Sequence, residues 1–417
     1  MSLAEFLRIL YQWQWLPFLG TFSGFYLAYY FLHVVQKPKI FGKDGPFRRF
    51  LQNECAVLSD YYWPTIWCFG AHAQTVVRAL LRSRPPVPFR RETLDTPDGG
   101  IMCLDWFDHE NSHYTNPLRR PTVLVLPGLT GGSETSYCRH LVLQGEKLGY
   151  RTIIANHRGF GASQLKTPRT FCAANTEDLK FVIDYIHGIY PGCPVLAVGI
   201  SMGGMILMNY LNEMKDADCG LIAGLVVSIP WDCAESTVSL EQPLNFLLFN
   251  RRLTGNLVRM VKSNLNVFQG RHNLYDINHV LNAKTVREFD ERFTSPTFGY
   301  SNYEEYYNAA SLHTKPLHTI TVPVLCLTAA DDPFSPLHAI PLKTIGNNPL
   351  FTLVLTAYGG HIGFIEGVMI HEQNYMDRVF AQFAKGVFDM EDTGEWQKLV
   401  SETRELARES GDATASE

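Results

Sequence analysis

The segment PVLAVGISMGGMILMNYLN, residues 194–212, decides the fold. Its aliphatic run at 194–200 is unbroken, which predicts a strand buried on both faces. The residues at 205–212 have the composition of a helix. Between them Ser201 stands in a Gly-x-Ser-x-Gly pattern, and a serine on such a strand-to-helix turn presents its hydroxyl at the edge of a sheet. The alternative, a glycine turn with an incidental serine, is disfavoured because a strand and a helix flank it.

Short aliphatic runs recur on both sides of this segment and alternate with helical patterns. This alternation predicts an α/β domain with a mostly parallel sheet. Pro97-Asp98-Gly99-Gly100 separates two further runs and predicts an antiparallel hairpin over 91–107. The predicted strands are 122–126, 152–155, 194–200, 221–229, 322–328 and 351–355, and the predicted helices include 135–148 and 176–190.

Composition divides the chain into further segments. Residues 231–321 interrupt the rhythm with helical patterns and many aromatic side chains, so we predict an inserted helical cap within an α/β domain at 91–388. Residues 37–90 are an aromatic-rich lead-in segment that we expect to pack against the main domain. Residues 389–417 are a polar C-terminal tail, for which a solvated helix and disorder are both open.

The N-terminus, residues 1–36, is predicted to be a membrane anchor. No charged residue occurs at 9–36, and residues 15–35 are dense in apolar side chains. A run of about 20 such residues matches the hydrocarbon thickness of a bilayer. A cleaved signal peptide and a buried core helix are the alternatives. The basic residues that follow, among them Lys37 and Lys39, predict a single-pass topology with the main domain in the cytosol.

Charge and cysteine usage exclude several classes of protein. The 417 residues carry a net charge of −5, which argues against a nucleic-acid-binding protein. The nine cysteines are scattered singly and form no Cys-x-x-Cys pair, which argues against a zinc module and for reduced, buried thiols. The sequence implies no metal and no organic cofactor.

A serine hydroxyl becomes a useful nucleophile only when a base removes its proton. His361 lies after the last predicted strand, in the glycine-framed run YGGHIGF at 358–364. Such glycines let a loop turn the imidazole towards Ser201. We therefore predict that His361, among 14 histidines, is the general base.

A carboxylate should orient that histidine and stabilise its charged form. Asp331 and Asp332 follow the predicted strand 322–328, and we prefer Asp332 because the prolines after it fix the exit of the loop. Asp331 could stiffen the turn instead. Asp232, which follows the strand 221–229, is the third possibility.

Ester cleavage through a serine also requires donors for the oxyanion that develops on the carbonyl. The backbone N–H of Met202, at the start of the helix, is one candidate. The other lies in the loop 126–132 after the strand 122–126, where Leu129 is our first choice and Thr130 the second. A simple Gly-Pro turn is the alternative for that loop.

Five motifs, taken in order, resemble the α/β-hydrolase superfamily. Shorter stretches at 62–67, 167–169, 175–179 and 287–290 resemble its membrane-anchored abhydrolase-domain subfamily, and the likeness extends from the anchor to about residue 385. The resemblance implies the same triad, Ser201, Asp332 and His361. His157 departs from the pattern, which leads us to expect an asparagine there. The five motifs are LPGLTGG (126–132), NHRGFGAS (156–163), GISMG (199–203), DDPFSP (331–336) and GGHIGF (359–364).

That subfamily contains a phospholipase that acts on phosphatidylcholine with medium-length or oxidatively truncated acyl chains, and a close sibling. The resemblance therefore implies a phospholipase A1/A2-like serine hydrolase that forms an acyl-enzyme on Ser201 and takes a phospholipid substrate from a bilayer. The aromatic and aliphatic runs of the cap, at 246–249 and 293–307, would supply part of an acyl-binding wall. Alternatives are a short-chain carboxylesterase, a thioesterase, an acyltransferase, and a catalytically silent lipid-binding scaffold.

Overall fold

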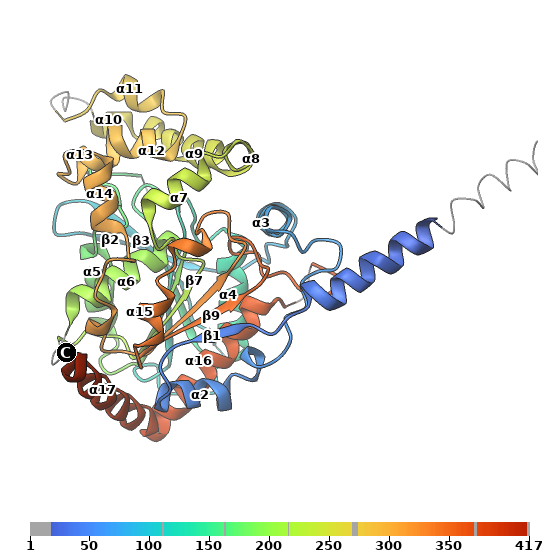
Figure 1. Ribbon diagram of the computed structural model, residues 1–417. Helices are drawn as coiled ribbons and strands as arrows, with labels where there is room; N and C mark the ends of the chain where they lie inside the picture. Colours follow the sequence, from blue (N-terminus) through green and yellow to red (C-terminus); the bar gives the residue numbers. More distant parts are fainter. Residues whose placement is uncertain are drawn as a thin grey trace, which may run out of the picture.

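A nine-stranded sheet runs through the body of the protein (Figure 1). The computed structural model describes residues 18–110, 112–161, 164–215, 217–268, 274–370 and 373–414. The strand order is β1-β9-β8-β7-β6-β4-β5-β3-β2. The strands are β1 (Lys39–Phe41), β2 (Arg90–Asp95), β3 (Ile101–Phe107), β4 (Thr122–Leu126), β5 (Arg151–Asn156), β6 (Val195–Ile200), β7 (Ala223–Val227), β8 (Val324–Ala329) and β9 (Phe351–Thr356).

The mostly parallel sheet predicted from the sequence is confirmed. Strands β4 to β9 pair in parallel, and the β2–β3 hairpin pairs antiparallel with β5 at one edge. At the other edge β1 pairs antiparallel with β9. The sequence did not predict β1, because three residues are too few for a recognisable pattern. In a parallel sheet the carboxyl ends of the strands meet at one edge, where ligands bind in open α/β folds.

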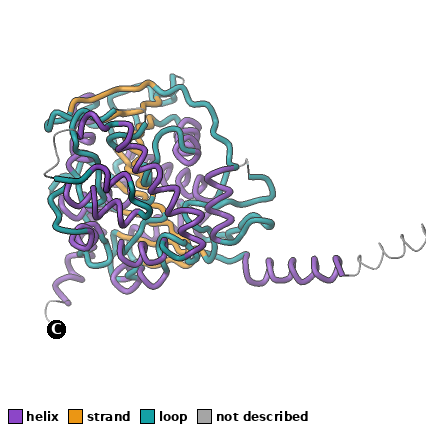
Figure 2. Tube along the Cα trace, turned by 90° about the horizontal axis from the view of Figure 1, so that it is seen from above, coloured by secondary structure: helices purple, strands orange, loops and turns teal. Residues whose placement is uncertain are grey.

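Helices cover both faces of the sheet, as seen along the chain trace in Figure 2. One core joins β-strand side chains to α2, α4, α16 and α17, and a second joins the opposite side chains to α5, α6 and α15. The helices are α2 (Pro46–Glu54), α4 (Ser136–Lys147), α5 (Glu177–Ile189), α6 (Met202–Met214), α15 (Leu342–Gly346), α16 (Tyr375–Thr393) and α17 (Glu395–Thr414).

The cap lies between β7 and β8, and its described residues form helices joined by loops. It stands above the carboxyl edge of the sheet (Figure 1) and has a core of its own, in which Phe268, Phe289 and Phe293 are almost fully buried. Its elements are α7 (Cys233–Leu240), α8 (Pro243–Asn245), η3 (Phe246–Asn250), α9 (Arg251–Ser263), α10 (Leu265–Phe268), α11 (Ile277–Leu281), α12 (Val286–Phe289), η4 (Asp290–Thr294), α13 (Ser295–Thr297) and α14 (Tyr303–Ala310).

The N-terminal segment differs from the predicted transmembrane helix. Residues 18–34 form a continuous helix that projects from the body (Figures 1 and 2) and ends in the π-helical turn η1 (Tyr30–Val34). No helix within the described residues is both long and apolar enough to cross a membrane, so the structure does not support the predicted span. The first residues of the predicted span, 15–17, lie outside the described part of the chain. Its last residues belong to the fold, because Tyr30, Val34 and Val35 are buried against the lead-in segment.

The lead-in segment and the C-terminal tail are both parts of the folded body. The lead-in segment contains β1, α2, η2 (Ala56–Leu58) and α3 (Ala71–Leu80). In the tail, α17 is a packed helix rather than a solvated one, because Trp396 is fully buried and donates a hydrogen bond of 3.1 Å to the Ile222 carbonyl. Two short turns, η5 (Leu317–Thr319) and η6 (Leu337–Ala339), complete the fold.

Candidate active site

Ser201 lies on a sharp turn between β6 and α6. Its φ of 53° and ψ of −119° are unusual for a residue with a side chain, and they hold Cβ at the edge of the sheet. The turn requires glycines. A Cβ at Gly203 would lie 2.2 Å from the Leu126 carbonyl oxygen, and one at Gly204 would lie 2.3 Å from Ile229 Cγ2. The Gly-x-Ser-x-Gly pattern therefore reflects a close approach of α6 to its neighbours.

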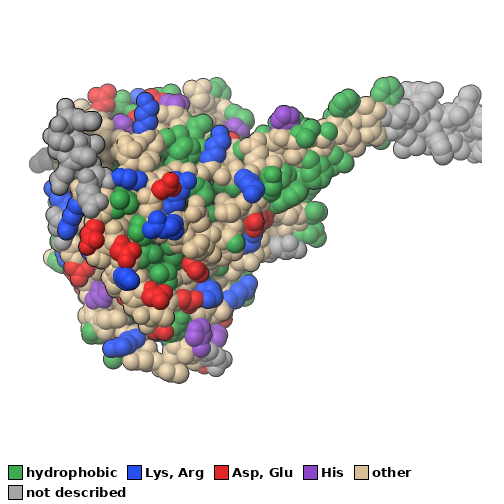
Figure 3. All heavy atoms as spheres, turned by 60° about the horizontal axis from the view of Figure 1, so that its bottom comes forward, with side chains coloured by type: hydrophobic (Ala, Val, Ile, Leu, Met, Phe, Trp, Pro, Cys, Tyr) green, Lys and Arg blue, Asp and Glu red, His purple; other side chains and the backbone are tan. Residues whose placement is uncertain are grey.

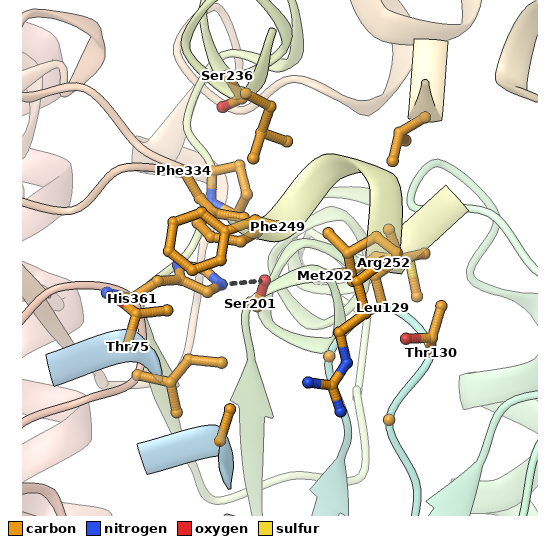
Figure 4. A pocket seen from close by; sticks show the side chains of 18 of the residues that line it. Thr75, Leu129, Thr130, Ser201, Met202, Ser236, Phe249, Arg252, Phe334 and His361 are labelled. Atoms are coloured by element: carbon orange, nitrogen blue, oxygen red, sulfur yellow. Dashed lines mark hydrogen bonds between the residues drawn. The ribbon is translucent and has the colours of Figure 1, made fainter. Parts of the chain in front are cut away.

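His361 meets the serine from the loop after β9 (Figure 4). The distance between His361 Nε2 and Ser201 Oγ is 2.9 Å. The loop is held from below by α3, because the His361 N–H donates to the Thr75 hydroxyl at 2.9 Å. The ring of Phe334 stacks on the imidazole with centroids 3.9 Å apart. These contacts fix both the backbone and the ring plane of His361.

The carboxylate that reaches His361 is that of Asp332. Its Oδ2 and Oδ1 lie 2.9 Å and 3.1 Å from His361 Nδ1. Asp332 is 4% exposed, and the Phe334 N–H donates to its Oδ1 at 2.7 Å. This arrangement holds the proton on Nδ1 and leaves Nε2 as an acceptor for the hydroxyl of Ser201.

The two other candidate acids have different contacts. Asp331 accepts a hydrogen bond of 2.8 Å from the Gly360 N–H, and burial, with Asp332 nearby, raises the pKa of Asp331 to about 7. It therefore supports the histidine loop. Asp232 caps α7, where its carboxylate accepts from the N–H groups of Ala234 and Glu235 at 2.8 Å and 3.2 Å.

The two predicted oxyanion donors come from separate elements. Met202 is the first residue of α6, so its N–H is not used by the helix's own hydrogen bonds and lies at the positive end of the helix dipole. Leu129 and Thr130 lie on the side of Ser201 opposite His361 (Figure 4). Thr130 has a φ of 60°, which turns the loop after β4 back over the serine.

That loop is anchored by two side chains. The Tyr137 hydroxyl accepts from the Gly128 N–H at 3.0 Å. His157, the departure from the family pattern, has its Nε2 2.8 Å from the Pro127 carbonyl oxygen. Since a carbonyl only accepts, Nε2 carries the proton, and burial lowers the pKa of His157, which favours a neutral ring. His157 thus acts as a buried hydrogen-bond donor to the loop.

A cavity of about 500 Å³ opens over Ser201 and His361. Most of its lining is apolar and comes from the cap, α3 and the loop after β4. Only some of the residues predicted to form the acyl-binding wall line this cavity. Phe293 belongs to the core of the cap, and Phe298 and Tyr300 do not line the cavity. The predicted residues that do line it are Leu247, Leu248, Phe249, Tyr306 and Tyr307.

Sequence reasoning missed the contribution of α3. Thr75 supports His361, and Arg78 lines the cavity. The amphipathic run AHAQTVVRALLR at 71–82 was a signal for a packed helix. Nothing local to that run indicates which loop it contacts. In the described part of the chain, no group of three or more His, Cys, Asp or Glu side chains could hold a metal ion.

Comparison with known proteins shows which proteins this chain is similar to. The sequence profile of the alpha/beta hydrolase fold matches residues 121–368. The chain is 46% identical over 369 residues to the human protein named Phospholipase ABHD3, covering 88% of this chain and 89% of that protein. It is 33% identical to Protein abhd-3.2 of Caenorhabditis elegans, covering 87% and 95%. It is 27% identical to Monoacylglycerol lipase ABHD2 of Mus musculus, covering 85% and 86%.

Proposed function

The chain belongs to the α/β-hydrolase family and is a hydrolase that acts on esters, and we propose that it cleaves acyl ester bonds of glycerophospholipids through an acyl-enzyme on Ser201. The observation that carries the proposal is the hydrogen-bonded series Ser201–His361–Asp332 at the floor of an apolar cavity. The relatives named Phospholipase ABHD3 support a phospholipid as the substrate.

In the proposed mechanism His361 Nε2 takes the proton from Ser201 as Oγ attacks the ester carbonyl. The N–H groups of Met202 and Leu129 stabilise the oxyanion of the tetrahedral intermediate. The bond to the lysophospholipid oxygen then breaks, and that oxygen receives the proton from His361. A water molecule, activated by the same histidine, hydrolyses the acyl-enzyme, so that a fatty acid leaves and Ser201 regains its proton. Asp332 holds the imidazole in the required tautomer throughout.

The cavity supports an acyl chain of limited length. A bound chain would contact Leu247, Leu248 and Phe249, which come from the cap and line the cavity. Burying a methylene group contributes about 0.8 kcal/mol, so each carbon that fits strengthens binding and each that does not fit adds nothing. We propose phosphatidylcholine with medium-length or truncated acyl chains as the preferred substrate.

The projecting N-terminal helix supports a role in reaching the bilayer. Its hydrophobic side chains are visible along its length in Figure 3, and Phe18, Phe22 and Phe25 are each 69–73% exposed. An exposed apolar surface of this kind is typical of membrane contact. We propose that residues 1–36 attach the protein to a membrane, with the catalytic domain on the cytosolic side. Protease added to sealed microsomes should then digest the catalytic domain, and complete protection would reverse the topology.

The proposed function is tested with purified full-length protein on phosphatidylcholine vesicles. Fatty acid release should be measured by mass spectrometry for acyl chains of increasing length, beside a water-soluble ester. We expect turnover of phosphatidylcholine with an optimum at medium length, and none by Ser201→Ala. Absence of phospholipid turnover, with the soluble ester still cleaved, would favour the short-chain carboxylesterase.

The role of the helix is tested by replacing Phe18, Phe22 and Phe25 with serine in the full-length chain. Turnover on vesicles should fall several-fold, while the soluble ester should be cleaved at the wild-type rate. Leu118→Ser removes a half-exposed apolar side chain from the body and serves as the matched control. Equal loss on both substrates would mean that the helix supports folding instead.

A further inference from the structure

Arg78 is a buried guanidinium on the wall of the substrate cavity. It lies on α3, is 3% exposed and lines the cavity over Ser201. None of its three guanidinium nitrogens has a hydrogen-bond partner among the residues that the structure describes. Buried charges in proteins are normally paired, because an unpaired charge loses its hydration without compensation. An anion bound in the cavity would supply the missing partner.

The acidic group near Arg78 is already paired with a second arginine through its Oδ2, while its Oδ1 has no hydrogen-bond partner among the described residues. Asp377 forms a buried ion pair with Arg82, one helical turn after Arg78, and it also accepts from the Asn374 N–H at 3.1 Å. Two buried guanidinium groups, those of Arg78 and Arg82, therefore face one carboxylate. Burial, with Arg82 adding to it, lowers the pKa of Arg78 to about 9, so the side chain stays charged at neutral pH.

Arg78 also lies close to the reacting centre. It lines the same cavity as Tyr137, whose hydroxyl accepts from the Gly128 N–H. Gly128 packs directly on the nucleophile, since a Cβ placed there would lie 3.3 Å from Ser201 Cβ. Arg78, the oxyanion loop and Ser201 thus line one cavity.

Two further arginines line the cavity, Arg84 after α3 and Arg252 in the cap. Arg252 is seen in the close-up of the pocket in Figure 4, and both residues are exposed. They add to the positive potential at the mouth of the cavity without requiring a bound partner. The buried Arg78 and the exposed arginines therefore differ in how much binding free energy an anion would gain by pairing with them.

We propose that Arg78 binds the phosphodiester anion of the substrate while the acyl ester lies at Ser201. The inference rests on the proposed function and names the polar group that the cavity recognises. A phosphodiester carries one negative charge, which would pair with the unpartnered guanidinium of Arg78, and a guanidinium binds phosphate oxygens through two parallel hydrogen bonds. Because the glycerol backbone joins the phosphate to the ester, one cavity has to hold both groups.

The first test compares two substrates that differ only in the phosphate. Arg78→Gln should be assayed on phosphatidylcholine and on diacylglycerol with the same acyl chains, both in mixed micelles. Loss of a charge-assisted interaction predicts a ten- to hundredfold fall in kcat/KM for phosphatidylcholine, mostly through KM, and a much smaller change for diacylglycerol. Arg78→Lys should recover part of the loss. Arg251→Gln, which removes a charge from the exposed side of the cap, is the matched control.

The second test uses wild-type protein and does not depend on a variant that folds. Hydrolysis of a neutral soluble ester is followed with glycerophosphocholine, inorganic phosphate or octanoate as competitor. Competition by glycerophosphocholine at lower concentration than the other two supports the proposal. If only inorganic phosphate competes, the cavity has a site for the free anion and not for a phosphodiester. If none of the three competes, the cavity has no anion site. Each of these two results would overturn the assignment of Arg78.

The outcomes separate this inference from the proposed function. If the wild type cleaves no phospholipid, the proposed function fails. If it cleaves phosphatidylcholine and Arg78→Gln does so equally well, the function stands and the phosphate site fails. Equal losses on phosphatidylcholine and diacylglycerol would assign Arg78 a structural role and also overturn the inference.

Discussion

The carboxyl edge of the sheet and the cap build the two halves of the site in different ways. At the edge, the backbone places each reactive group: Ser201 is held by a strained turn, and His361 by a loop that α3 supports. In the cap, side chains of helical turns form the wall, and neighbouring aromatic residues divide between the wall and the cap's own core. The edge should therefore tolerate almost no change, whereas the cap should tolerate substitution and alter substrate preference.

The largest effect should come from the acid at the edge. Asp332→Asn removes the charge that orients His361, and a fall in kcat of about 10⁴-fold is expected, as in other serine triads. Asp331→Asn and Asp232→Asn should each cost less than about tenfold, because those carboxylates contact backbone N–H groups. Steady-state kinetics on a soluble ester compare the three. If Asp232→Asn abolished most of the activity while Asp332→Asn lowered it only slightly, the catalytic acid would be Asp232 in the cap instead.

Glycine substitutions compare how well the sheet edge and the cap tolerate an added methyl group, measured as the free energy of unfolding. Gly203→Ala would force a Cβ to 2.2 Å from a backbone oxygen, which predicts a loss of about 1–3 kcal/mol in the free energy of unfolding. Gly255 on α9 has no atom within 4 Å of the corresponding position, so Gly255→Ala should gain up to about 1 kcal/mol from helix propensity. Chemical denaturation measures both. Equal tolerance at the two positions would mean that the edge is no more rigid than the cap.

Each region also holds a buried carboxyl group whose pKa is raised to about 7 by burial, Asp331 at the edge and Asp290 in the cap. Between the ordinary pKa near 4 and pH 7, the folded state binds more protons than the unfolded state. Stability should therefore fall as pH rises through this window, by at most about 1.4 kcal/mol per pH unit for each group. The variants Asp331→Asn and Asp290→Asn should each flatten the profile of unfolding free energy from pH 5 to 8. An unchanged slope in both variants would contradict the raised pKa values.

The smallest effect should come from the wall of the cap. Leu247 is 62% exposed and lines the cavity, so Leu247→Ala should change stability by less than about 0.5 kcal/mol. Loss of part of the acyl contact, about 1 kcal/mol, predicts a roughly fivefold lower kcat/KM for medium-length chains and no change for acetyl esters. A rate profile across chain lengths checks this. A uniform loss on all esters would mean that Leu247 positions the catalytic edge.

The same difference explains what the sequence could predict. Local sequence patterns predict the strands, the turn at Ser201 and the histidine loop. This is because the glycines and aliphatic runs determine the conformation of the segment in which they occur. The contact of Thr75 with His361 could not be predicted in this way, since the two residues are 286 positions apart and meet only where α3 packs against the histidine loop. The burial of Arg78 on the same helix depends on that packing as well. The polar composition of residues 389–417 indicates a solvated helix or disorder, and it does not reveal that Trp396 packs in the body. The N-terminal run predicts a membrane span from its length and its uncharged, apolar composition, and these do not reveal that its last turn is buried in the body.

The central claim, that the edge of the sheet makes Ser201 a nucleophile, is tested most directly with a fluorophosphonate probe. The probe reacts with an activated serine, and mass spectrometry of the digested protein locates the adduct. We expect one adduct per chain on Ser201, and none in a Ser201→Ala variant whose circular dichroism matches the wild type. Undiminished labelling of that folded variant, or an adduct on another residue, would contradict the claim.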